Sequence, residues 1–96
     1  DLSPDWLVLQ VPVQALLEGD TVTLRCRIWQ TIQITQVRFY HEEKKLGEFL
    51  EGTELSLPPL RLNDSGRYRC GGVWYRSWHS KPVTVTVHGE HPTAGT

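Results

Sequence analysis

The chain has 96 residues, with ten Lys and Arg against eleven Asp and Glu, which gives a formal net charge of −1. This length suits one small domain, and the near-neutral balance of interspersed charges argues against a nucleic acid or an anionic membrane surface as partner. No apolar run approaches the roughly 20 residues of a transmembrane helix, and the chain opens without the pattern of a signal peptide. We therefore expect a mature segment without an anchor of its own.

Short alternating segments recur about every ten residues, which is typical of an all-β domain, and no segment has a helical period. Pro12 restricts the first strand to a sheet edge, because proline cannot donate to a ladder. Residues 42–45 have the composition of a charged hairpin turn. We expect one domain over residues 5–88, between linker-like segments at 1–4 and 89–96. In chain order, strands are expected at residues 5–11, 21–27, 34–41, 46–50, 53–57, 66–73 and 83–87.

The two cysteines fall on inward positions of two alternating strands. Cys26 shares the inward face of its strand with Val22 and Leu24, and Cys70 shares that of another strand with Tyr68. A bridge between them is expected, because a chain this short buries only a little over ~60% of the surface that its unfolded form exposes. Disulfides persist in oxidising compartments, so the pair predicts an extracellular protein. The alternative is a cytosolic domain with two free buried thiols.

The string Asp64-Ser65-Gly66-Arg67-Tyr68-Arg69-Cys70 is the most specific local pattern. Tyr68 occupies the tyrosine-corner position two residues before the second cysteine, where the hydroxyl bonds to upstream backbone. Phe39 stands where a tryptophan usually packs on the disulfide, and we expect it to fill that space. These features predict an all-β, immunoglobulin-like (C2/I-type) two-sheet Greek-key sandwich with one intersheet disulfide between Cys26 and Cys70.

Further motifs extend over nearly the whole chain, from residue 5 to residue 87. They are Asp5-Trp6-Leu7-Val8-Leu9-Gln10, Glu18-Gly19-Asp20, Leu24-Arg25-Cys26 with Trp29, Val37-x-Phe39-Tyr40 and Ser80-Lys81-Pro82-Val83-Thr84-Val85-Thr86-Val87. This arrangement resembles the second immunoglobulin domain of leukocyte Fc receptors and Fc receptor-like proteins. The resemblance implies a multi-domain receptor on the surface of immune cells that recognises immunoglobulin Fc or a related immune protein. It also implies contacts through the B–C loop, the C–C′ region and the F–G loop, with Trp29 at the position that stacks on a proline of the antibody.

Large aromatic residues and an arginine gather in the F–G segment, residues 71–79. Binding residues of sandwich domains gather in loops, and Trp, Tyr and Arg dominate binding hot spots because they bury large areas at low entropic cost. The alternative is that some of these rings fold back over the core or pack on a neighbouring domain, as we expect of Trp6. With the B–C loop and the C′ region included, the predicted ligand-binding residues are Trp29, Gln30, Thr31, Ile32, Glu48, Phe49, Trp74, Tyr75, Arg76 and Trp78.

The sequence contains no catalytic or metal-binding signature, so we predict that the domain is not an enzyme and uses no cofactor and no metal. Asn63-Asp64-Ser65 is an N-glycosylation sequon on an expected turn. The expected partners are a protein ligand and neighbouring immunoglobulin domains of the same receptor, outside the plasma membrane or in a secreted form. We expect no nucleic acid and no direct contact of this domain with the membrane. The alternative function is a structural spacer or a homotypic adhesion domain, and the aromatic residues in the loops favour recognition.

Overall fold

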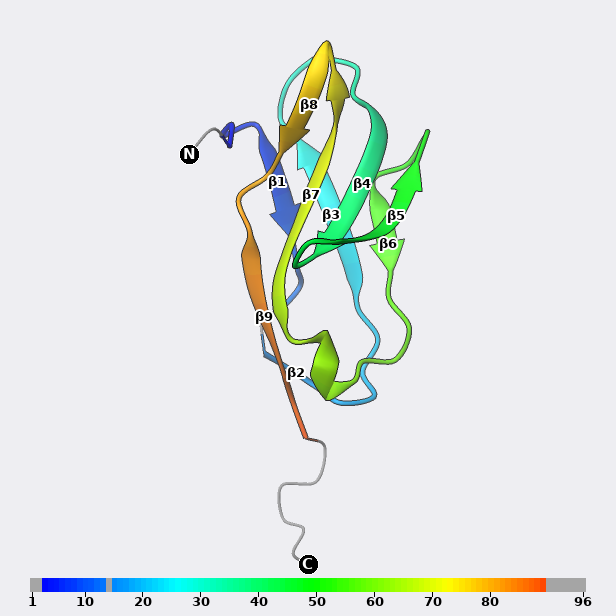
Figure 1. Ribbon diagram of the computed structural model, residues 1–96, viewed down its shortest axis with the longest axis vertical. Helices are drawn as coiled ribbons and strands as arrows, with labels where there is room; N and C mark the ends of the chain where they lie inside the picture. The colour runs from blue at the N-terminus through cyan, green and yellow to red at the C-terminus, as the bar shows by residue number, and fades with distance from the viewer. Residues whose placement is uncertain (1–2, 14, 90–96) are drawn as a thin grey trace, which may run out of the picture.

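The computed structural model describes residues 3–13 and 15–89, so residues 1–2 and 90–96 of the predicted linkers lie outside the described residues. The elements of the described residues are β-strands and one short 3-10 helix (Figure 1). Within these ranges no helix is long and apolar enough to cross a membrane. In chain order the elements are β1 (Leu7–Gln10), β2 (Ala15–Leu17), β3 (Thr23–Ile28), β4 (Thr35–His41), β5 (Lys44–Phe49), β6 (Glu54–Ser56), η1 (Leu62–Asp64), β7 (Gly66–Trp74), β8 (Arg76–His79) and β9 (Val83–His88).

Two packed sheets form the domain, as Figure 1 shows. One sheet has the strand order β1-β3-β6, and the other has the order β2-β9-β7-β4-β5, with β8 paired to β7. The predicted immunoglobulin-like sandwich is therefore confirmed. Alternation within the strands builds the core, because inward residues of both sheets interdigitate while outward residues face solvent.

The first strand is shorter than predicted, and the chain then changes sheets. β1 pairs antiparallel with β3, whereas β2 pairs parallel with β9 in the opposite sheet. Pro12 lies between the two, where its missing N–H ends the first ladder. The prediction of a single strand over residues 5–11 missed β2, which has only three residues and a partner near the other end of the chain.

The core is centred on the predicted disulfide. Cys26 on β3 and Cys70 on β7 are bonded across the two sheets, with their Cα atoms 5.9 Å apart. Phe39 on β4 is fully buried and lies opposite Cys70 in the β4–β7 register. This position confirms that phenylalanine fills the space usually taken by tryptophan. The other buried apolar residues are Leu7, Leu9, Leu16, Val22, Leu24, Val37, Leu60, Tyr68, Val85 and Val87.

The predicted charged turn at residues 42–45 is tighter in the structure. β4 ends at His41 and β5 begins at Lys44, so only Glu42 and Glu43 form the turn. Glu42 has a positive φ of 56°. Its backbone N–H donates to the Arg67 carbonyl at 2.8 Å, and its carboxylate accepts the Arg67 backbone N–H at 2.9 Å. These bonds to β7 hold the turn in a conformation that a glutamate seldom adopts.

Tyr68 forms the predicted tyrosine corner. Its hydroxyl donates to the Asp64 carbonyl at 2.5 Å, and the His41 ring stacks on its ring with centroids 4.4 Å apart. Burial of the phenol, reinforced by the carboxylates of Asp64 and Glu42, raises the pKa of Tyr68 from 10.0 to about 12. The folded state therefore favours the neutral phenol, and its contribution to stability is fully present below pH 10 and is lost as the pH rises toward 12.

We predict that Tyr68→Phe lowers the free energy of unfolding by about 1 kcal/mol at neutral pH, because one hydrogen bond to a backbone carbonyl is lost. The variant is also expected to lose less stability than the wild type between pH 10 and 12. Urea unfolding followed by circular dichroism at several pH values measures both effects. Parallel pH curves for the two proteins would contradict the assignment of this titration to Tyr68.

Candidate binding surface

The F–G segment is a β-hairpin rather than the predicted loop. β7 and β8 pair from Gly71 opposite His79 to Trp74 opposite Arg76, and Tyr75 alone makes the turn, with a positive φ of 66°. A side chain at Gly71 would run into the backbone of β8, so the pairing requires glycine there. The hairpin therefore extends the sheet and carries the Tyr75 ring, which is 92% exposed, at its tip.

Trp78 is turned toward the body of the domain. Its ring is half-buried against the core, its indole N–H donates to the Trp74 carbonyl at 3.0 Å, and the Arg76 guanidinium lies 4.1 Å from its ring centroid. Trp6 packs on it edge to face, with ring centroids 5.1 Å apart. Of the two interpretations left open for this segment, the structure thus assigns Trp78 to the edge of the core. Trp6, predicted to pack on a neighbouring domain, packs here within its own domain.

Trp29 lies on the surface directly after β3. The residue is 57% exposed, and the Arg27 guanidinium lies 4.3 Å from its ring centroid. Its backbone N–H donates to the Trp6 carbonyl at 2.7 Å, which fixes the start of the B–C loop. An exposed ring on a fixed backbone can be buried by a partner at little further entropic cost.

Trp6 connects the two halves of the predicted site. Its carbonyl accepts from Trp29, and its ring packs on Trp78 of the F–G hairpin. The loop between β3 and β4 and the tip of the β7–β8 hairpin lie at the same end of the sandwich in Figure 1. We call residues 29–34 and 74–78 the aromatic end. Sequence patterns could not predict this role of Trp6, because it depends on contacts between residues far apart in the chain.

The other predicted B–C residues follow Trp29 at the aromatic end. Gln30 and Thr31 are exposed, and Ile32 is half-buried. Gln30 and Ile32 line an open hollow of ≈ 390 Å³, together with Thr53 from the segment before β6. Gln30 and Ile32 follow Trp29 closely in the sequence, and the hollow that they line offers both apolar and amide groups to a ligand.

The predicted C′ residues lie on β5, which is separated from β7 by β4. Glu48 is exposed and accepts a hydrogen bond from the Lys45 ammonium at 2.9 Å, and this bond together with the lysine charge lowers the pKa of Glu48. Phe49 points toward the core, where its ring lies 6.2 Å from that of Phe39. Leu50, which follows it, is the exposed apolar residue of this region.

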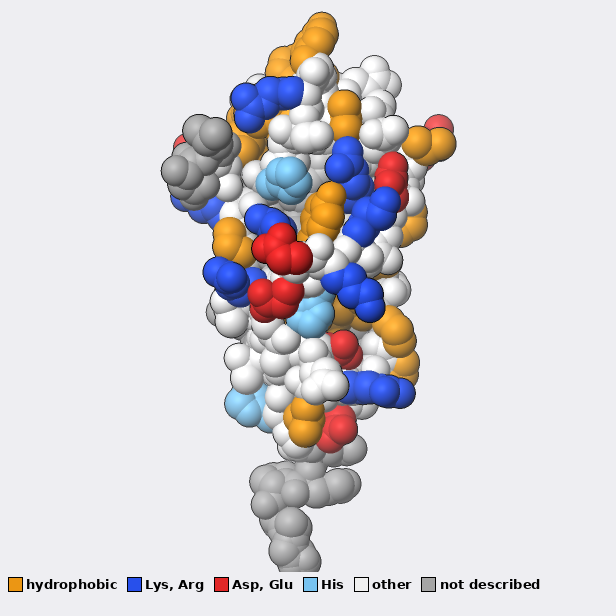
Figure 2. Space-filling model, viewed as in Figure 1, with side chains coloured by type: hydrophobic (Ala, Val, Ile, Leu, Met, Phe, Trp, Pro, Cys, Tyr) orange, Lys and Arg blue, Asp and Glu red, His pale blue; other side chains and the backbone are white. Residues whose placement is uncertain are grey.

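The outer face of the larger sheet carries charges of both signs, intermixed in Figure 2. Ion pairs across it join Lys45 to Glu48 and Arg69 to Glu43. His79 on β8 has a lowered pKa, because of burial and then of the positive charges of nearby arginines. The face therefore mixes charges of both signs, and two of its cations are paired with carboxylates.

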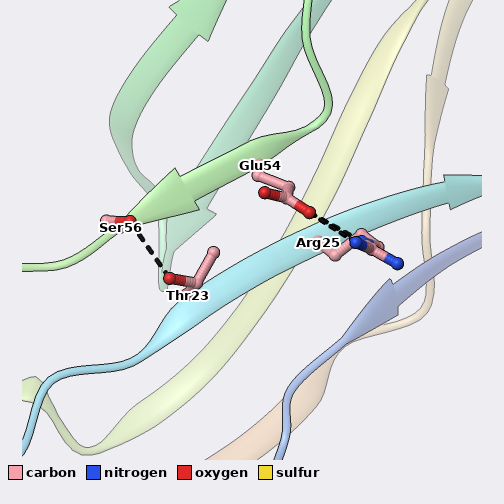
Figure 3. Close-up of polar contacts among 4 residues, drawn as sticks. All are labelled: Thr23, Arg25, Glu54 and Ser56. Carbon is pink, nitrogen blue, oxygen red and sulfur yellow. Dashed lines mark hydrogen bonds and ion pairs between the residues drawn. The ribbon is translucent and has the colours of Figure 1, made fainter.

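Polar pairs occupy the outer face of the smaller sheet. Between β3 and β6, the Arg25 guanidinium binds the Glu54 carboxylate at 2.6 Å, and the hydroxyls of Thr23 and Ser56 are hydrogen-bonded at 3.0 Å (Figure 3). These four side chains thus pair with one another across the two strands. Over the described parts of the chain, no three His, Cys, Asp or Glu side chains lie close enough to hold a metal ion.

Comparison with known proteins agrees with this architecture. The family model described as immunoglobulin domain matches residues 6–87, and the chain belongs to this family. The chain is 42% identical over 86 residues to the low affinity immunoglobulin gamma Fc region receptor II of Mus musculus, covering 88% of this chain and 26% of that protein. It is also 42% identical over 92 residues to Fc receptor-like A of Rattus norvegicus, covering 90% of this chain and 26% of that protein. The curated relatives are thus Fc receptors and Fc receptor-like proteins, as the sequence motifs predicted, and the chain spans about a quarter of their length.

The same family appears among solved structures of this fold. The crystal structure of the second Ig-C2 domain of human Fc receptor-like A superposes with a TM-score of 0.72 at 20% identity, covering 86% of this chain and 96% of that one. At this identity the likeness concerns the fold alone. The relatives carry the names of receptors, in agreement with the prediction that the domain is not an enzyme.

We predict that Trp78→Ala lowers the free energy of unfolding by about 2 kcal/mol, because a half-buried ring at the core edge is removed. Tyr75→Ala, which removes an exposed ring from the same hairpin, serves as the matched control and should change stability by less than about 0.5 kcal/mol. Urea unfolding of both variants makes the comparison. Equal stabilities would show that Trp78 does not brace the hairpin.

Proposed function

We propose that this domain belongs to the extracellular part of an immune-cell surface receptor and recognises immunoglobulin Fc or a related immune protein through its aromatic end. Support comes from the relatives, whose names are those of immunoglobulin Fc receptors and Fc receptor-like proteins. The single observation that carries the proposal is the exposure of two large rings, those of Trp29 and Tyr75, at one end of the sandwich.

The physical basis is the cost of leaving such rings in water. Trp29 is 57% exposed and Tyr75 is 92% exposed, although burial of either ring would be favourable. Trp and Tyr anchors surrounded by half-buried neighbours are typical of binding hot spots. Arg27 and Arg76 lie over tryptophan rings and keep their guanidinium groups at the surface, where they can donate to acceptors of a partner.

The rigidity of the aromatic end also favours binding. Tyr75 lies on a paired hairpin, and Trp29 is tied by its backbone to Trp6. Ordering flexible loops during association costs free energy, so rings that are already held in place retain more of their interaction energy. In the proposed site, Gln30 to Ile32 complete the contact beside Trp29. Glu48 and Phe49, predicted as further contacts, lie on β5, where Phe49 packs toward Phe39, so the proposal assigns the principal contact to the aromatic end.

A spacer or homotypic adhesion domain is the second candidate function. It is favoured by the exposed apolar residues Leu17 and Leu62, which a neighbouring domain could cover. They lie on β2 and η1, at the end of the sandwich opposite the aromatic end (Figure 1). A spacer has no evident need for exposed rings at the aromatic end, so the two functions predict different effects of removing them.

We predict that Trp29→Ala and Tyr75→Ala each weaken binding of the full ectodomain by about 2 kcal/mol, roughly thirtyfold in affinity. The measurement is surface plasmon resonance against a panel of immunoglobulin classes and their Fc fragments, with circular dichroism to verify folding. Leu62→Ala is the matched control, because Leu62 is similarly exposed, at 51%, but lies at the opposite end. Unchanged affinity in both ring variants would leave the spacer function as the better account.

A further inference from the structure

The sequence contains a single asparagine, Asn63, and it opens the triplet Asn63-Asp64-Ser65. We infer that Asn63 carries an N-linked oligosaccharide. This triplet is the acceptor signal for N-glycosylation in secreted and surface proteins. The inference rests on the extracellular location in the proposed function, but on none of its statements about ligand binding. Because no other asparagine is present, any N-glycan on this chain has only one possible position.

Asn63 is accessible and its neighbours are held in place. It lies in η1, on the turn between β6 and β7, and is exposed. The next residue is fixed on two sides, since the Asp64 carbonyl accepts from Tyr68 and its carboxylate accepts the Arg61 backbone N–H at 2.8 Å. In the described residues the Asn63 side chain makes no hydrogen bond. An amide that contributes nothing to the fold can carry a sugar without loss of stability.

The hydroxyl of the sequon has a second role in the folded domain. Ser65 Oγ accepts the backbone N–H of Val87 on β9 at 2.9 Å, and Ser65 is partly buried. The acceptor signal requires this hydroxyl, so the oligosaccharide must be attached before the turn docks on β9. Attachment forms a bond from Asn63 Nδ2 to the anomeric carbon of a lipid diphosphate-linked oligosaccharide. The bond from that carbon to the diphosphate oxygen breaks, and one Nδ2 proton leaves.

The position of Asn63 also divides the surface of the domain. η1 and the tip of the β7–β8 hairpin lie at opposite ends of the sandwich in Figure 1. An oligosaccharide on Asn63 therefore stands beside the exposed Leu62 and leaves the aromatic end uncovered. It would shield one of the two apolar residues that favour the spacer function, and it is compatible with recognition through Trp29 and Tyr75.

The test is peptide mapping of the full-length protein produced in mammalian cells and purified without reduction. Trypsin cleaves after Arg61 and Arg67 and releases residues 62–67. We expect this peptide to be found without a sugar only after enzymatic removal of N-glycans, and then with aspartate in place of asparagine at position 63. Asn63→Gln should abolish the glycan completely without changing the unfolding curve. Ser65→Thr, which keeps the hydroxyl, should retain it.

Recovery of the 62–67 peptide with an unmodified asparagine from the wild-type protein would overturn the proposal. The state of the Cys26–Cys70 pair in the same sample distinguishes two explanations for an unmodified Asn63. An unmodified Asn63 with the disulfide formed refutes the glycan alone, because the chain has then passed through an oxidising compartment. An unmodified Asn63 with two free thiols refutes the glycan and also the extracellular location in the proposed function.

Discussion

The bond between Cys26 and Cys70 is the constraint on which the rest of the domain depends. It joins β3 of one sheet to β7 of the other, 44 residues apart in sequence. Closing a loop of that length stabilises the fold by about 4 kcal/mol in the chain-entropy model, which is a large share of the stability of a small domain. Phe39 packs opposite Cys70 and fills the space between the sheets. β7 is thereby fixed on both sides, and the hairpin that continues it inherits this rigidity.

From this core a chain of contacts leads to the candidate site. β7 runs from the disulfide to Trp74, whose carbonyl accepts the indole N–H of Trp78. Trp78 packs on Trp6, and the Trp6 carbonyl accepts from Trp29. The Tyr75 ring packs edge to face on that of Trp74, with centroids 5.0 Å apart, and extends the series at its other end. The inner members of the series are half-buried, whereas Trp29 and Tyr75, at its two ends, are exposed. Packing of the inner rings therefore holds the outer rings at the surface.

The fold could be predicted from local patterns, whereas the arrangement of the site depends on contacts between distant residues. The alternation of apolar and polar residues around Cys26 and the string that ends at Cys70 were enough to predict the sandwich, because each pattern lies within one strand or turn. β2 was missed because its partner is β9, and three residues carry too little alternation to stand out. The direction in which Trp78 points was open for a similar reason. It depends on Trp6, and sequence spacing alone cannot place one ring on the other.

Hydrogen–deuterium exchange on the full ectodomain, alone and bound to an immunoglobulin that it recognises, tests the central claim most directly. Recognition through the aromatic end predicts that binding slows exchange in residues 29–34 and at the tip of the β7–β8 hairpin. Exchange in β2 and η1 should stay unchanged, because they lie at the opposite end of the sandwich (Figure 1). Slowed exchange confined to the outer face of β1, β3 and β6, or to η1, would contradict the account.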